Sequence, residues 1–112
     1  MVISKTKLFN AELQANAELF KALAHPARLT ILKYLAETKT CITGDFAGEL
    51  PLSRTTVNQH LTELKDAGLL VFHTEGVKTY YCLNQKKICD LKKMTKALFD
   101  EISLPEDFNC NP

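Results

Sequence analysis

The sequence predicts a mainly α-helical domain that carries one two-stranded β hairpin. Apolar residues recur at helical spacing through most of the chain before Gly68, and two of these helical segments meet at a short turn around Pro51. After Gly68 the pattern changes from helical to alternating, and a turn at Gly76 divides the alternating stretch into two strands. A helix-turn-helix followed directly by a hairpin is a winged helix-turn-helix.

Length and composition favour one soluble domain over residues 1–112. The net charge is only +1, so nucleic-acid binding would have to use a local basic cluster. No apolar run approaches the roughly 20 residues that span a bilayer, and the N-terminus lacks the apolar core of a secretory signal. We therefore expect a cytoplasmic protein without a membrane partner, in which all four cysteines are reduced thiols.

The first helix is expected over residues 7–23, with apolar stripes on two sides that suit packing between two surfaces. Pro26 begins a second, mostly buried helix, because a proline at the first helical position has no N–H to leave unpaired. Near its start lies Arg28, which could reach a DNA phosphate or form a salt bridge to a neighbouring helix.

Residues 43–67 form the predicted helix-turn-helix: a short helix over 43–50, a turn, and a helix that Ser53 caps and Gly68 ends. Val57, Leu61 and Leu64 give this last helix an apolar side. Arginine, asparagine and glutamine pair bidentately with guanine and adenine edges. The outward residues predicted to read bases in double-stranded DNA are Arg54, Thr55, Asn58 and Gln59, with Ser53, Thr56, Lys78 and Arg28 contacting the backbone. A merely solvated polar face is the alternative.

The wing is expected over 69–83, the last helix over 86–103 and a flexible tail over 104–112. Apolar residues of the last helix recur by three and four positions, as in a coiled-coil seam. The seams of the two terminal helices suit a homodimer, although they could also cover the monomer's own core. The predicted dimer contacts are Phe9, Leu13, Phe20, Ile88, Leu91, Leu98 and Ile102.

Three stretches resemble, in order and spacing, the ArsR/SmtB family of bacterial winged-helix repressors. They are LFKALAHPARLTILKYL at 19–35, SRTTVNQHLTELKDAGLL at 53–70 and EGVKTYY at 75–81. The resemblance implies a homodimer built on the first and last helices and operator binding by the helix that follows Ser53. It also implies release from DNA when an inducer binds.

The resemblance does not identify the inducer. The zinc-sensing pattern of the family falls on Asp90, Lys92, Ser103 and Glu106, which lack both imidazoles. The paired thiols of the family's soft-metal sensors fall on Cys41 and Thr43, which leaves one thiol. Soft ions such as arsenite, antimonite or cadmium prefer thiolates. We expect no required cofactor, and we interpret a soft ion as a candidate effector at Cys41, Cys89 and Cys110, with thiol oxidation or no effector as alternatives.

An enzyme and a protein-interaction module are the two alternative function classes. Nothing in the sequence indicates an enzyme, because it has no nucleophile–base pattern, no phosphate-binding glycine loop and no paired carboxylates in an apolar setting. A winged helix can also serve as a protein-interaction module, but the polar set on the capped helix argues against that use. Salt-dependent binding to duplex DNA would separate these two alternatives.

Overall fold

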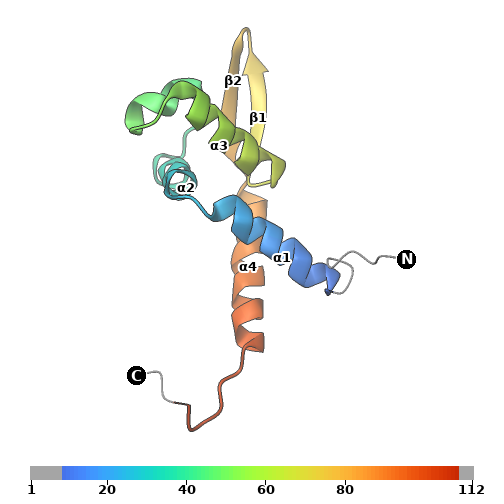
Figure 1. The fold of residues 1–112 in the computed structure, drawn as a ribbon. Coiled ribbons are helices and arrows are strands. Elements are labelled where there is room, and N and C mark those ends of the chain that lie inside the picture. The colour runs from blue at the N-terminus through green and yellow to red at the C-terminus, as the bar shows by residue number, and fades with distance from the viewer. Residues whose placement is uncertain (1–8, 109–112) are drawn as a thin grey trace, which may run out of the picture.

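The computed structural model describes residues 9–108, without the side chains of residues 47–49. The elements are α1 (Ala11–Leu23), α2 (Pro26–Thr38), the 3₁₀ helix η2 (Gly44–Glu49), α3 (Arg54–Asp66), β1 (Leu70–Glu75), β2 (Lys78–Leu83) and α4 (Gln85–Glu101). The β1–β2 hairpin projects from one side of the helices and α4 extends in the opposite direction (Figure 1). This arrangement confirms the predicted winged helix-turn-helix. No helix among residues 9–108 is long and apolar enough to cross a membrane.

Local capping explains where the helices begin. The Asn10 side chain accepts a hydrogen bond from the Glu12 N–H at 2.7 Å, so α1 begins at Ala11, while residues 7 and 8 of the predicted helix lie outside the described residues. In α2 the ring of His25 accepts from the Ala27 N–H at 3.0 Å. That helix extends to Thr38 and ends where Lys39 adopts a left-handed conformation, with φ of 56°.

The short helix predicted over 43–50 is a 3₁₀ helix rather than an α-helix. Its first turn is held by Thr43, whose hydroxyl accepts from the Asp45 N–H and whose carbonyl accepts from the Phe46 N–H. This short, tight helix is enough to direct Phe46 into the core.

The core lies between α2 and α3 and is closed by residues that flank the wing. Ile31 and Leu35 of α2 meet the buried side of α3, and Leu69 is fully buried at the start of the hairpin. The α3 residues in this cluster are Val57, Leu61 and Leu64, each with 0% exposure. Burying a side chain of this size contributes about 1.5–3 kcal/mol. The core therefore fixes the apolar side of α3 and leaves its polar side to solvent.

The wing is a regular antiparallel hairpin in which Leu70 pairs with Leu83 and Glu75 pairs with Lys78. Its turn consists of Gly76 and Val77, which confirms the predicted turn at Gly76. Gly76 has φ of 62°, as a tight two-residue hairpin turn requires.

Cys41 and Cys82 form a disulfide, so the expectation of four free thiols is wrong for these two residues. An isolated antiparallel bridge between Ile42 and Tyr81 places the neighbouring Cys41 and Cys82 opposite each other. Their Cα atoms are 4.5 Å apart, although 41 positions separate them in the sequence. Cys89 is a free, exposed cysteine, and Cys110 lies outside the described residues.

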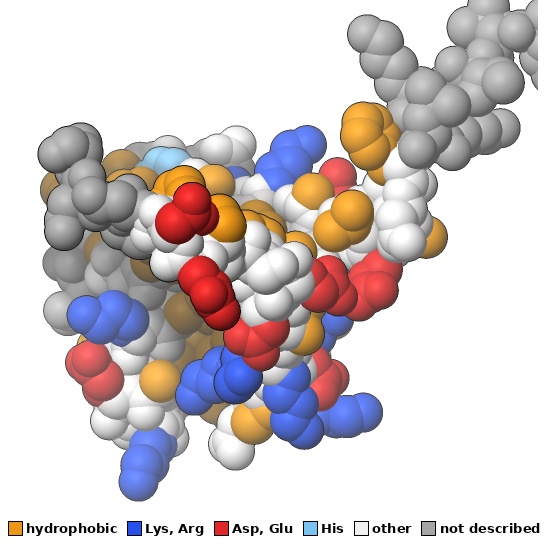
Figure 2. Space-filling model, turned by 90° about the horizontal axis from the view of Figure 1, so that it is seen from below, with side chains coloured by type: hydrophobic (Ala, Val, Ile, Leu, Met, Phe, Trp, Pro, Cys, Tyr) orange, Lys and Arg blue, Asp and Glu red, His pale blue; other side chains and the backbone are white. Residues whose placement is uncertain are grey.

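Helix α4 packs only loosely on its own chain. None of its residues is buried, and Ile88 and Leu91 near its start are the ones that contact the core. Phe99 on this helix and Ile102 just after it are 61% and 56% exposed. Seen from the end opposite the wing, hydrophobic side chains reach the surface among acidic and basic ones (Figure 2).

Candidate nucleic-acid interface

The polar side of α3 is built as the sequence predicts. The Ser53 hydroxyl accepts from the Thr56 N–H at 3.2 Å and contacts the Thr56 hydroxyl at 3.0 Å, which fixes the start of the helix. Four of the predicted base-reading and positioning residues follow with exposed side chains on one helix: Arg54, Thr55, Asn58 and Gln59. These side chains present amide and guanidinium donors on a rigid element whose opposite side is fixed in the core.

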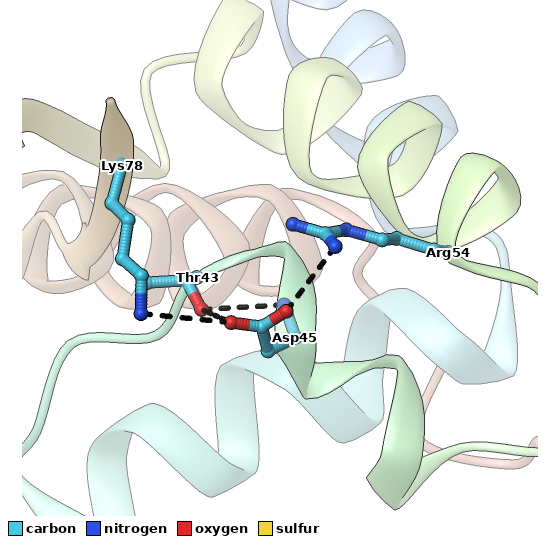
Figure 3. A network of polar contacts seen from close by, with 4 residues as sticks. All are labelled: Thr43, Asp45, Arg54 and Lys78. Atoms are coloured by element: carbon cyan, nitrogen blue, oxygen red, sulfur yellow. Dashed lines mark hydrogen bonds and ion pairs between the residues drawn. The ribbon is translucent and has the colours of Figure 1, made fainter.

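Asp45 links α3 to the wing, and sequence reasoning missed it. Its carboxylate lies 3.3 Å from the Arg54 guanidinium and 4.0 Å from the Lys78 ammonium (Figure 3). The Thr43 hydroxyl donates to the same carboxylate at 3.3 Å. One acidic side chain therefore pairs with two of the cations predicted to contact DNA.

A groove of about 530 Å³ runs between the start of α3 and the wing. Its lining includes Asp45, Arg54, Asn58 and Lys78. The groove is narrow at Gly44, where an added Cβ would come within 2.7 Å of the Asn58 amide oxygen and 3.2 Å of the Arg54 side chain. Gly44 thus lets η2 approach α3 without displacing two candidate base-reading side chains.

Arg28 is directed inward as well as toward the polar side of α3. Its guanidinium donates to the His60 ring at 3.1 Å and to the Ala22 carbonyl at 3.0 Å. It also lines a shallow hollow beside Thr55 and Gln59 on α3. This geometry holds α3 against the α1–α2 corner and leaves part of Arg28 beside the polar side of α3.

His60 is the buried polar residue of α3, 7% exposed, and its Nε2 atom has no hydrogen-bond partner. Burial lowers its pKa, and the neighbouring His25 and Arg28 lower it further, while Glu63 opposes them. The His25 and His60 rings are 4.2 Å apart, so two histidines that look unrelated in sequence are in contact. A neutral His60 can accept the hydrogen bond from Arg28, which a protonated ring cannot.

The candidate soft-ion ligands are not brought together as three thiols in this structure. Cys41 is bonded to Cys82 and Cys89 is exposed, while Cys110 falls beyond the last described residue. Among residues 9–108 no group of three or more histidine, cysteine or acidic side chains is placed to hold a metal ion.

Known proteins share both the sequence pattern and the fold. A family described as a helix-turn-helix domain matches residues 23–71. An uncharacterized HTH-type transcriptional regulator of Methanocaldococcus jannaschii is 34% identical, over 73% of this chain and 92% of its own length. The transcriptional repressor PagR of Bacillus anthracis is 32% identical, over 82% and 92% respectively.

Two further similarities bear on regulation and assembly. The cadmium resistance transcriptional regulatory protein CadC of Listeria innocua is 28% identical, over 88% of this chain and 83% of its own length. A homodimeric winged helix-turn-helix DNA-binding domain from Mycobacterium bovis, described as a possible ArsR-family transcriptional regulator, is 28% identical. Its solution structure superimposes with a TM-score of 0.64 over 97% of each chain. These relatives are transcriptional regulators rather than enzymes.

Proposed function

We propose that this chain, which belongs to the ArsR/SmtB family of helix-turn-helix transcriptional regulators, represses transcription by binding a specific operator as a homodimer. The observation that carries the proposal is the groove shared by α3 and the wing. It joins two candidate base-reading side chains, Arg54 and Asn58, to the phosphate-binding candidate Lys78. In a helix-turn-helix the second helix lies in the major groove and contacts base edges near its N-terminal end.

The homodimer is supported by apolar residues that the monomer leaves exposed on α1 and α4. Phe9 and Leu13 near the start of α1 are 64% and 47% exposed. Leu13 lines a hollow together with Met94 and Leu98 of α4, so the two helices contribute to one surface. A two-fold dimer built there would present two α3 helices to major grooves about 10 base pairs apart, or a multiple of that.

The test is operator binding by single-residue variants, on duplexes that the wild-type protein selects from genomic fragments at physiological salt. Arg54→Ala and Gln59→Ala should each cost on the order of 1–3 kcal/mol on the selected duplex and little on an unrelated one. Lys78→Ala should weaken both duplexes alike and flatten the salt dependence. Lys93→Ala, an exposed lysine on α4, is the matched control. Normal binding by both α3 variants would refute the assignment of that helix.

For the effector, we infer a species that acts on cysteine sulfur. A relative named for cadmium resistance supports a soft ion such as cadmium, arsenite or antimonite, held by Cys41, Cys89 and Cys110. This site requires the Cys41–Cys82 disulfide to be reduced first. Micromolar arsenite added to the reduced protein on DNA should release it, and Cys41→Ser, Cys89→Ser and Cys110→Ser should each weaken that response. Unchanged affinity of the wild type would exclude arsenite as the effector.

An oxidant of thiols is the second candidate effector, because the Cys41–Cys82 disulfide lies beside the groove between α3 and the wing.

A further inference from the structure

Cys41 and Cys82 are held opposite each other by the backbone as well as by their disulfide. Ile42 and Tyr81 exchange two backbone hydrogen bonds, of 2.9 and 2.7 Å, next to the cysteine pair. The 4.5 Å between the cysteine Cα atoms is the spacing of a non-hydrogen-bonded antiparallel pair. The backbone therefore keeps the two sulfur atoms adjacent when the disulfide is reduced, so the bond can form again without a large movement.

The surroundings of Cys82 favour reaction at its sulfur. The Nδ1 atom of His73 lies 3.9 Å from the Cys82 sulfur, and the Glu75 carboxylate lies 3.5 Å from the other ring nitrogen. An imidazole at this position can take the thiol proton and leave the thiolate, which is the reactive form. Cys41 is exposed and Cys82 is half-buried, so a small oxidant can reach the pair.

The disulfide also anchors the segment that carries Asp45. This segment, residues 41–45, runs beside β2 from Cys82 through the Ile42–Tyr81 bridge to Lys78 near the wing turn. At its far end the Asp45 carboxylate pairs with Arg54 and Lys78. While the disulfide is intact, a DNA phosphate competes with this carboxylate for both cations.

We propose that Cys41 and Cys82 form a reversible oxidation site that takes a hydroperoxide and thereby lowers operator affinity. The proposal rests on the proposed DNA-binding function. Reduction removes the covalent anchor at the start of the 41–45 segment and leaves the Ile42–Tyr81 bridge as its remaining tie to β2, so Asp45 gains freedom to move away from Arg54 and Lys78. Exposed ion pairs of this kind are weak, and releasing both should raise affinity roughly fivefold per half-site.

The chemistry balances with the hydroperoxide as the oxidant. The Cys82 thiolate attacks the O–O bond, an S–O bond forms, and the leaving alkoxide takes a proton to become an alcohol, or water from hydrogen peroxide. The Cys41 sulfur then attacks the Cys82 sulfenic acid, so the S–S bond forms and the S–O bond breaks. The hydroxide released takes the Cys41 proton and leaves as water. Two thiols lose two electrons and two protons, and a dithiol reductant reverses the change by exchange.

The experiment compares the reduced full-length protein before and after stoichiometric hydrogen peroxide, with Cys89→Ser as the matched cysteine control. Thiols are counted by alkylation and mass spectrometry, and binding to a selected duplex is measured by fluorescence anisotropy. After peroxide, the wild type and Cys89→Ser should each lose two alkylatable thiols and bind the duplex roughly fivefold more weakly per half-site. Dithiothreitol should restore both the thiol count and the affinity. Cys41→Ser and Cys82→Ser should not form this disulfide, and Asp45→Asn should form it without a change in affinity. His73→Gln should slow disulfide formation.

Two results would overturn the proposal: both thiols remaining alkylatable after peroxide, or a disulfide that leaves affinity unchanged or raises it. Failure of the proposed DNA-binding function would give a different result in the same experiment. A reduced protein that binds no duplex would refute DNA binding and with it the control of affinity, whereas the thiol count would still show whether the pair is oxidised.

Discussion

Replacing Asp45 with asparagine should strengthen DNA binding. Asparagine keeps the shape and the hydrogen-bonding capacity toward the Thr43 hydroxyl, but it removes the charge that pairs with Arg54 and Lys78. Both cations would then meet the DNA without first losing a carboxylate partner. The substitution therefore isolates one electrostatic effect at the junction of the wing and α3.

The size of the effect follows from the exposure of the groups. The side chains of Arg54, Asp45 and Lys78 are 67%, 60% and 59% exposed, so each ion pair contributes only on the order of 0.2–1 kcal/mol. Together the two pairs amount to about 1 kcal/mol per half-site. A dimer that engages both half-sites would gain about 2 kcal/mol, or roughly thirtyfold in affinity.

Fluorescence anisotropy of the disulfide-bonded protein over a range of salt concentrations is the assay, with Asp100→Asn as the control. Asp100 lies on α4, pairs with Lys96 at 2.8 Å, and gives the same change in net charge far from the wing. Asp45→Asn should bind both selected and unrelated duplexes more tightly, most clearly at low salt. Equal gains in the two variants would show that only net charge matters. Weaker binding by Asp45→Asn would show that Asp45 positions Arg54 for base contact, and would refute the reasoning.

Three further predictions concern stability and assembly. Leu61→Ala should lower the free energy of unfolding by about 2–5 kcal/mol in urea titrations, because the side chain is fully buried. Thr62→Ala, at an exposed position, should change the free energy of unfolding by less than about 0.5 kcal/mol, and similar losses in both variants would contradict the core assignment. Burial lowers the pKa of His60, so the contribution of His60 to stability is fully present above about pH 6.5 and is lost as the pH falls through the lower folded-state pKa. In urea titrations at several pH values, His60→Gln should flatten the dependence of the free energy of unfolding on pH, and an unchanged dependence would contradict this prediction. Phe99→Glu should convert the proposed dimer to monomer in sedimentation at tens of micromolar, because it places a charge on the exposed apolar surface of α4. Val77→Glu at the exposed wing turn should stay dimeric, and a dimeric Phe99→Glu would place the interface elsewhere.

The features that the sequence predicts well are those that depend on neighbouring residues. The Ser53 cap, the apolar side of α3 and the turn at Gly76 all follow from local spacing, and each is present. The Cys41–Cys82 disulfide depends on the pairing of Ile42, in the loop after α2, with Tyr81 of β2, and no local sequence pattern predicts this pairing. Asp45 was missed for the same reason, since its partners come from two other elements.

The exposed apolar surface of α4 has a consequence for how such a regulator would respond to its own abundance. A helix of 17 residues without one buried residue, which contacts its own core through Ile88 and Leu91 near its start, would gain further stabilising contacts when a second chain covers it. Stability would then rise with protein concentration, because association favours the folded form by mass action. For the proposed dimer, operator occupancy at low expression would grow with the square of the monomer concentration. Small changes in synthesis or degradation would therefore produce a sharper transition between an open and a silenced promoter than a monomeric repressor could give.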